Sequence, residues 1–342
     1  MDISNSFHPM LPLRPAGIQT MLGSSKFRTW GANRMSAAAR DIIFKTPDGV
    51  KLLGSYSQHD GRSTKGILLH GWEGSVDSTY ILCTGRTLFR NGYNILRLNL
   101  RDHGQSHHLN KGIFYAVMLE EVFQAVKQAT RLAGELPVFL AGFSLGGNFV
   151  LRILQRCINH PIVNLHHAVA ISPVLDPEKA TFKTDQTFLI RRYFLKKWFG
   201  SLKKKQQLFP ILYDFSKVFS LSTIAAVTEV MLNDYSNYGS SKDYFRQYSV
   251  VKEAIKDITI PTTIITSADD PIIPVEDFYQ LKTNDFTTLV IQPYGGHNGF
   301  IDGLYLQSWY EQRMIMIFDE TARKRSISEV RDEAGVWNII SY

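Results

Sequence analysis

The chain has very little cysteine, with only Cys83 and Cys157 among 342 residues. Two cysteines are too few for the disulfide framework of a small secreted domain. Neither lies in the C-x-x-C or Cys/His spacing that a structural zinc site needs. We therefore expect no disulfide scaffold and no structural zinc.

Long hydrophobic runs are also missing. No apolar stretch approaches the ~20 residues that a membrane-spanning helix requires, because segments such as F-V-L-R-I-L are interrupted by charge. The N-terminal residues contain Asp2, Pro9 and Pro12 where a signal peptide would need an unbroken apolar stretch. These features predict a cytoplasmic protein.

Acidic residues are scarce between positions 183 and 217, where only Asp185 and Asp214 occur. The basic residues of this segment are Lys183, Arg191, Arg192, Lys196, Lys197, Lys203, Lys204, Lys205 and Lys217. Such a run is usually a solvated helix face, and the alternative is a surface that meets an anionic membrane. No nucleic-acid-binding motif is present, so we expect no nucleic-acid partner.

Short apolar runs alternate with helical segments along most of the chain. Residues 41–57 predict a hairpin around the turn P-D-G, strands are predicted at 65–70, 93–100, 137–143, 167–172, 258–267 and 287–292, and helices at 78–90, 114–133, 148–156, 275–281 and 303–323. This alternation predicts an α/β fold with a mostly parallel sheet covered by helices on both faces.

The pattern is interrupted once. From 177 to 257 the chain is helical, basic and aromatic, with Phe188, Tyr193, Phe194, Trp198 and Phe199 near its centre. We interpret 1–176 and 258–342 as two parts of one α/β core, the second ending in a C-terminal tail, and 177–257 as an inserted helical cap. An aromatic stripe of this kind is more often core than substrate pocket.

The stretch G-F-S-L-G-G at 142–147 follows the apolar run V-F-L-A and precedes a helical segment. Gly142 and Gly146 allow a sharp strand-to-helix turn that exposes the side chain of Ser144. In a parallel sheet such groups collect where the carboxyl ends of the strands converge. Asp269 and Asp270 follow a later strand and His297 follows the final one, which is the chain order Ser, Asp, His of one hydrolase fold.

Acyl transfer assigns a role to each of these groups. The Ser144 hydroxyl is a weak nucleophile, so His297 would take its proton and later return it. An aspartate, either Asp269 or Asp270, would orient the imidazole. The oxyanion would need two backbone N–H donors, for which we select Leu145 and Trp72, the residue that follows His70 and Gly71.

Six segments together resemble the α/β-hydrolase superfamily, and in particular its YheT-like branch, which is related to the eukaryotic abhydrolase-domain lipases. They are P-L-R-P-A-G-I-Q-T-M-L-G (12–23), H-G-W-E-G-S (70–75), N-L-R-D-H-G (99–104), G-F-S-L-G-G-N (142–148), A-D-D-P-I-I-P (268–274) and G-G-H-N-G-F (295–300). The resemblance implies hydrolysis of lipid-like or medium-chain esters by a catalytic serine, and it favours Asp270 as the acid because members place it directly before a run such as P-I-I-P. It implies no cofactor.

The remaining histidines do not predict a metal site. His103 and His107 would share a helix face only if a helix spanned them, and Gly104 beside Asp102 predicts a loop. We expect Arg101 and Asp102 to brace the active-site loops, and we expect the histidines to be partly solvated.

The expected activity is therefore cleavage of carboxylic esters with an apolar acyl group. Two alternatives remain: an acyltransferase that passes the same acyl group to an alcohol, and a non-catalytic scaffold at a membrane. Peripheral membrane contact through 183–217 is compatible with each of them.

Overall fold

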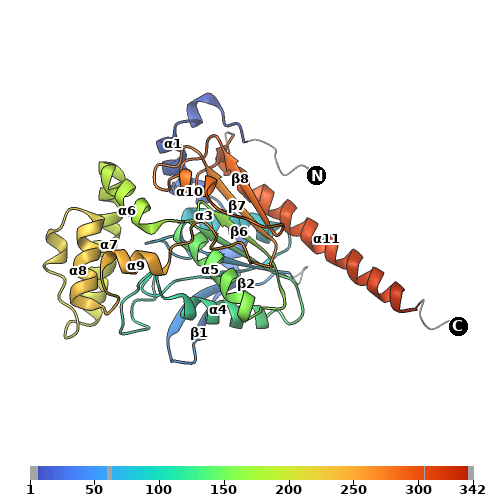
Figure 1. The fold of residues 1–342 in the computed structure, drawn as a ribbon, viewed down its shortest axis with the longest axis horizontal. Coiled ribbons are helices and arrows are strands. Elements are labelled where there is room, and N and C mark those ends of the chain that lie inside the picture. Colours follow the sequence, from blue (N-terminus) through green and yellow to red (C-terminus); the bar gives the residue numbers. More distant parts are fainter. Residues whose placement is uncertain (1–6, 60–63, 304, 338–342) are drawn as a thin grey trace.

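The computed structural model describes residues 7–59, 64–303 and 305–337, with side chains up to residue 323. Its main feature is an eight-stranded sheet with the strand order β1-β2-β4-β3-β5-β6-β7-β8 (Figure 1). The strands are β1 (Ala39–Lys45), β2 (Lys51–Ser57), β3 (Lys65–Leu69), β4 (Asn94–Leu98), β5 (Val138–Phe143), β6 (Leu165–Ile171), β7 (Thr262–Ser267) and β8 (Thr287–Gln292).

The six strands from β4 to β8 in the sheet order run parallel to one another. At one edge β1 and β2 form an antiparallel hairpin, and β2 also pairs antiparallel with β4. Parallel strands have their carboxyl ends at a common edge of the sheet. The loops after β3, β4, β5, β7 and β8 therefore meet there, as the sequence predicted. The mostly parallel sheet confirms the expected α/β architecture.

Two hydrophobic clusters cover opposite faces of the sheet because successive side chains of a strand point to opposite sides. Ile67 and Leu69 pack in one cluster with α4 (Leu119–Arg131) and α5 (Leu145–Asn159), whereas Leu68 packs in the other with α3 (Thr79–Arg90) and α11 (Trp309–Trp337). Strands β3, β4, β5 and β7 are buried at every position, as expected for central strands that are covered on both faces.

The segment 177–257, which we call the cap, lies between β6 and β7 and forms a helical layer at one end of the molecule (Figure 1). Its elements are α6 (Pro177–Gln186), α7 (Phe188–Leu208), the 3-10 turn η3 (Val218–Ser220), α8 (Ile224–Tyr235) and α9 (Ser241–Gln247). Asp176 begins the first cap helix because its carboxylate accepts the N–H of Lys179, and Pro177 at the first helical position is preset for helical geometry.

Short elements complete the chain. They are η1 (Leu11–Leu13), α1 (Ala16–Gly23), η2 (Lys26–Thr29), α2 (Arg34–Ala37), α10 (Glu276–Tyr279) and a small hairpin of β9 (Ile301–Asp302) and β10 (Gln307–Ser308). Element types match the sequence predictions better than their limits do. The helix predicted at 114–133 begins only at Leu119, and the last helix continues to Trp337 through the region expected to be a tail.

None of the helices in the described part of the chain combines the length and apolar character needed to cross a lipid bilayer.

Candidate active site

Ser144 occupies the junction between β5 and α5 with a left-handed backbone, at φ 54° and ψ −117°. Such a conformation costs a residue other than glycine roughly 1–3 kcal/mol. The turn also requires glycine on either side, since a Cβ on Gly142 would lie 2.2 Å from the Gly146 carbonyl oxygen, and one on Gly146 would lie 2.4 Å from that of Leu69. The glycines flanking the serine are thus required by close backbone contact.

Asp270 and His297 form a buried pair. Asp270 Oδ2 lies 2.8 Å from His297 Nδ1, and Asp270 Oδ1 accepts the N–H groups of Ile272 and Ile273 over 2.8 and 2.9 Å. These backbone donors orient the carboxylate. If Nδ1 carries the proton shared with Asp270, Nε2 of His297 is free to act as a base.

Asp269 has a different partner, since its Oδ1 accepts the N–H of Gly296 over 2.9 Å. Burial raises the pKa of Asp269. The backbone N–H of His297 donates to Thr20 Oγ1 over 2.9 Å, so helix α1 supports the histidine loop. Thr20 lies within residues 12–23, and no spacing pattern in the sequence indicates its contact with the His297 backbone.

The loop after β3 holds the peptide that carries the N–H of Trp72. The Gly71 carbonyl accepts from His70 Nδ1 over 2.7 Å and from the Gly74 N–H over 2.9 Å, while His70 Nε2 accepts the N–H of Leu100. Because a peptide unit is planar, fixing this carbonyl also fixes the Trp72 N–H on its opposite side. Burial lowers the pKa of His70 to about 4, so its imidazole stays neutral.

Leu145 is the first residue of α5. The N–H groups of the first helical turn have no partner within the helix, and they lie at the positive end of its dipole. Leu145 and Trp72 thus each provide a backbone N–H in the segments next to Ser144, whose Cβ lies 3.1 Å from where a Cβ on Gly71 would be.

Ser144, Leu145 and Trp72 line a common cavity of about 130 Å³ between the core and the cap. Most of the remaining wall is apolar or aromatic and includes Phe114, Tyr115, Val174, Phe194, Trp198, Ile224, Met231, Leu232, Tyr244, Phe245, Tyr248 and Ile272. The Trp72 ring stacks on Phe194, with centroids 5.4 Å apart, and meets Trp198 edge-on at 5.0 Å. The loop after β3 and helix α7 therefore share one aromatic wall.

The cap aromatics singled out in the sequence fall into three groups. Phe194 and Trp198 line the cavity. Phe199 packs against the main hydrophobic cluster. Phe188 and Tyr193 are exposed. The expectation that the aromatic residues of the cap pack in the core is therefore correct for only some of these five residues.

The histidines near the site are more buried than expected. His70, His103 and His107 are all buried, and only His108 among the neighbouring histidines is exposed, so the prediction of partial solvation was wrong for these three. Burial lowers the pKa of His103 well below its usual value and that of His107 to about 4. They act as neutral hydrogen-bonding groups.

The prediction that the basic segment 183–217 forms a solvated helix face is wrong for Lys205. It is fully buried and pairs with Asp102 over 2.8 Å, whereas Lys203 and Lys204 are exposed. Burial raises the pKa of Asp102 to about 6 and lowers that of Lys205, and the pairing opposes both shifts. The sequence contains a signal for this burial, because Lys205 lies at helical spacing from Leu195 and Leu202 and therefore on the same buried face of the helix.

Arg101 also braces the loop after β4, through an ion pair with the buried carboxylate of Glu121. Within residues 7–59, 64–303 and 305–323, no three His, Cys, Asp or Glu side chains are grouped as a metal site would require.

The fold and the serine turn define a class. The α/β-hydrolase family matches residues 67–304, and the chain belongs to this family. Among its relatives is an Escherichia coli (strain K12) protein named "Putative esterase YheT", 25% identical over 266 residues, or 72% of this chain and 74% of the relative. "Phospholipase ABHD3" of Homo sapiens is 22% identical over 311 residues, or 86% and 75% of the two chains.

Solved structures share the fold. The Pyrococcus furiosus esterase Pf2001 superposes with a TM-score of 0.54 at 20% identity, covering 85% of this chain and 93% of its own. A serine hydrolase from Cycloclasticus zankles gives 0.56 at 16% identity, covering 82% and 98%.

Proposed function

We propose that this α/β hydrolase cleaves carboxylic esters with an apolar acyl group through an acyl-enzyme formed on Ser144. The observation that carries the proposal is the strained serine turn at the wall of an apolar cavity, with the Asp270–His297 pair at the same edge of the sheet. The names of the relatives, an esterase and a phospholipase, are consistent with this class of reaction.

The reaction follows from these groups. His297 Nε2 removes the Ser144 proton as Oγ attacks the ester carbonyl, and the Asp270 carboxylate stabilises the imidazolium. The N–H groups of Trp72 and Leu145 stabilise the oxyanion. Collapse of the intermediate breaks the carbon–oxygen bond, and His297 protonates the departing alcohol. Water, activated by the same base, then releases the acid and restores Ser144.

The cavity also limits the acyl group. An apolar cavity of ~150 Å³ holds benzene, so the cavity of about 130 Å³ is suited to a chain of roughly six carbons or one aromatic ring. We expect hydrolysis of p-nitrophenyl esters to be fastest for acyl chains of about four to eight carbons, and much slower for palmitate.

The primary test is labelling of the protein with a fluorophosphonate, followed by peptide mass spectrometry. We expect the label on Ser144 and none in Ser144→Ala. A well-folded wild-type protein that takes no label and cleaves no ester in the panel would overturn the proposal. Addition of an alcohol acceptor separates hydrolysis from acyl transfer, because only transfer makes a new ester.

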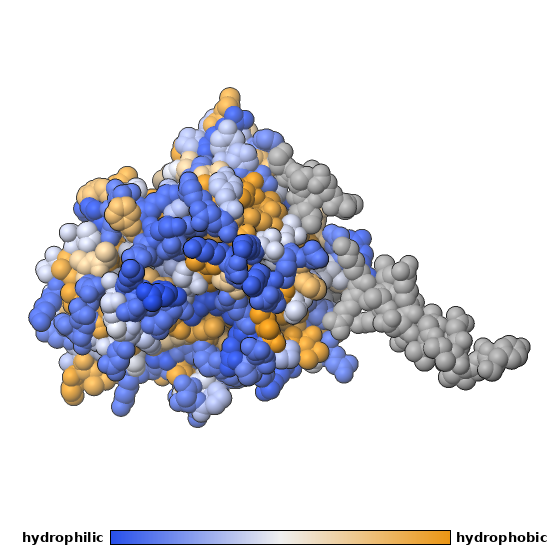
Figure 2. Space-filling model, viewed as in Figure 1, coloured by the Kyte–Doolittle hydropathy of each residue, from blue (hydrophilic) through white to orange (hydrophobic). Residues whose placement is uncertain are grey.

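Helix α7 supports a second proposal, that the cap contacts an anionic membrane surface. This helix contains seven Lys or Arg residues and no Asp or Glu. Phe188, Leu189 and Tyr193 are exposed beside Arg192 and Lys196. Figure 2 shows hydrophobic and hydrophilic residues side by side over the cap end of the molecule. Exposed aromatic and basic side chains on one helix are typical of an interfacial helix.

Vesicle sedimentation tests the membrane contact. We expect the protein to sediment with phosphatidylserine-containing vesicles and not with pure phosphatidylcholine, and we expect Phe188→Ser/Leu189→Ser and Arg192→Glu/Lys196→Glu to abolish binding. Lys45→Glu/Lys51→Glu, on the exposed β1–β2 hairpin, is the matched charge control. Equal binding by all variants would contradict the role of α7.

A further inference from the structure

The loop after β4 contacts both the cap and the loop after β3. We call the latter the oxyanion loop, because it carries the Trp72 N–H that the proposed function assigns to the oxyanion. On one side His103 Nε2 accepts the backbone N–H of Glu73 over 3.1 Å. His103 Nδ1 in turn donates to the carbonyl of Arg101 over 2.7 Å. A nitrogen that accepts an N–H carries no proton, so these two contacts fix a single neutral tautomer of His103.

Glu73 is the residue that follows the oxyanion donor Trp72, and its backbone is left-handed at φ 53°. A residue other than glycine keeps this conformation only where surrounding contacts hold it. The contact from His103 holds the peptide after Trp72, and the contact from His70 holds the peptide before it. The two histidine rings also pack on each other, with centroids 4.9 Å apart.

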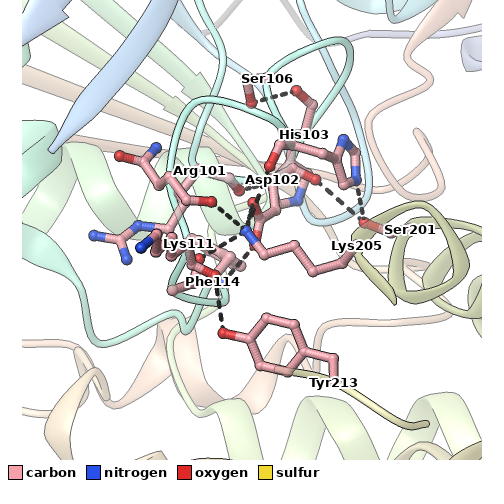
Figure 3. A network of polar contacts seen from close by, with 12 residues as sticks. Arg101, Asp102, His103, Ser106, Lys111, Phe114, Ser201, Lys205 and Tyr213 are labelled. Carbon is pink, nitrogen blue, oxygen red and sulfur yellow. Dashed lines mark hydrogen bonds and ion pairs between the residues drawn. The ribbon is translucent and has the colours of Figure 1, made fainter. Parts of the chain in front are cut away.

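On its other side the same loop is held by helix α7 (Figure 3). Lys205 Nζ donates to Asp102 Oδ1 over 2.8 Å and to the carbonyls of Asn110 and Gly112 over 2.7 and 2.9 Å. Ser201 Oγ donates to the carbonyl of Asp102 over 3.2 Å. Asp102 directly precedes His103, so the cap fixes the backbone from which the histidine extends.

Asp102 is held firmly from the core as well. Its Oδ2 accepts the N–H of Phe114 over 3.1 Å, and its own backbone is left-handed at φ 56°. Ser201 additionally lies 2.8 Å from His107 Nε2, which ties a second point of the loop to α7. One continuous chain of contacts therefore runs from the cap helix to the residue beside the oxyanion donor.

We infer that His103 is a positioning residue for the oxyanion hole, and that Lys205 and Ser201 of the cap hold it in place. The inference rests on the proposed function, because it assigns the Trp72 N–H to the oxyanion. Docking of the cap and alignment of the oxyanion donor are then coupled. His103 is buried and does not line the cavity that contains Ser144, so we assign it no direct contact with the substrate.

The test uses two substitutions of His103 whose side chains differ in length. In His103→Gln the amide oxygen replaces Nε2 as acceptor for the Glu73 N–H, whereas the Asn side chain of His103→Asn is too short. We expect His103→Gln to keep kcat within about 3-fold, and His103→Asn to lower kcat by about 10- to 100-fold with little change in KM, because a displaced donor weakens transition-state binding selectively. His108→Asn, at an exposed neighbouring histidine, is the control.

Three outcomes are distinguished. Equal kcat in the wild type and both His103 variants would overturn the inference. An equal loss of kcat in the Gln and Asn variants would also overturn it, because the loss would then be independent of an acceptor for the Glu73 N–H. A wild type that takes no fluorophosphonate and cleaves no ester removes the proposed function, and with it the basis of the inference. Thermal unfolding of each variant shows whether the compared proteins are equally folded.

The cap contribution is tested with Ser201→Ala, which removes the Ser201 contacts to Asp102 and His107 and leaves Lys205 in place. We expect a fall in kcat of about 3- to 10-fold, and we expect the double variant Ser201→Ala/His103→Asn to lose no more than His103→Asn alone, because coupled residues are not additive. Full additivity in the double variant would show that Ser201 does not act through His103.

Discussion

Two buried aspartates, Asp102 and Asp270, follow strand ends at the same edge of the sheet, and they differ in their partners. Asp270, after β7, accepts two backbone N–H groups and pairs with the imidazole of His297. Asp102, after β4, accepts one backbone N–H and pairs with the ammonium of Lys205. An imidazole changes its charge near neutral pH, whereas an ammonium keeps its charge. Burial of a carboxylate at a strand end therefore does not distinguish the two aspartates, whereas the ionisation of the partner does.

The largest effect should come from Asp270→Asn. We expect kcat to fall by about 10³- to 10⁴-fold, because the amide stabilises the wrong imidazole tautomer and no imidazolium. Asp269→Asn, which alters the carboxylate that accepts the Gly296 N–H, should cost about 10-fold or less. Steady-state kinetics on the preferred ester measures both. A larger loss of kcat in Asp269→Asn than in Asp270→Asn would show that Asp269, and not Asp270, is the carboxylate that assists His297.

Lys205→Met should lower the stability of the protein as well as kcat. It leaves Asp102 buried without its ion-pair partner, and breaking such a pair costs about 3–5 kcal/mol of unfolding free energy. Adding Asp102→Asn should recover part of this loss, because the uncompensated charge is removed. Urea unfolding of the single and double variants measures the difference. A double variant less stable than Lys205→Met would show that Asp102 is not the charge that Lys205 compensates.

The smallest effect concerns Glu73, in the loop between these two sites. Burial raises its pKa to about 8, Lys197 and Lys204 oppose this shift, and Asp102 adds to it. A carboxyl with a raised pKa in the folded state contributes stability that is complete below its unfolded value near 4.5 and is lost as pH rises towards 8. Unfolding free energies measured from pH 5 to 8 should therefore increasingly favour Glu73→Gln over the wild type as the pH rises. A constant difference would contradict the raised pKa.

The sequence predicted the core well because each of its elements leaves a local pattern. Buried strands such as β3 are short apolar runs, and the turn at Ser144 needs glycines whose spacing is visible in one line of sequence. The order of Ser144, Asp270 and His297 along the chain is equally visible. The structure adds the distances that relate Asp270, rather than Asp269, to the histidine.

Contacts between distant segments could not be predicted in the same way. Lys205 stands in a run of three lysines, and composition alone cannot show which one turns inwards. Its helical spacing from Leu195 and Leu202 was the signal that composition obscured. Thr20 lies 277 positions from His297, and a hydroxyl that accepts one backbone N–H leaves no pattern in either segment. Similarly, His103 is recognisable as a support for the oxyanion loop only once β3 and β4 are paired.

The cap enters and leaves the core through the connection between two adjacent parallel strands, β6 and β7, so it is an obvious module for exchange between related enzymes. The buried lysine sets a condition on such engineering. A transplanted cap that lacks an ammonium at the place of Lys205 would leave the host with an unmatched anion, and one that brings a lysine to a host without Asp102 would bury an unmatched cation. Chimeric enzymes of this kind should therefore be designed with the two residues inherited as a unit.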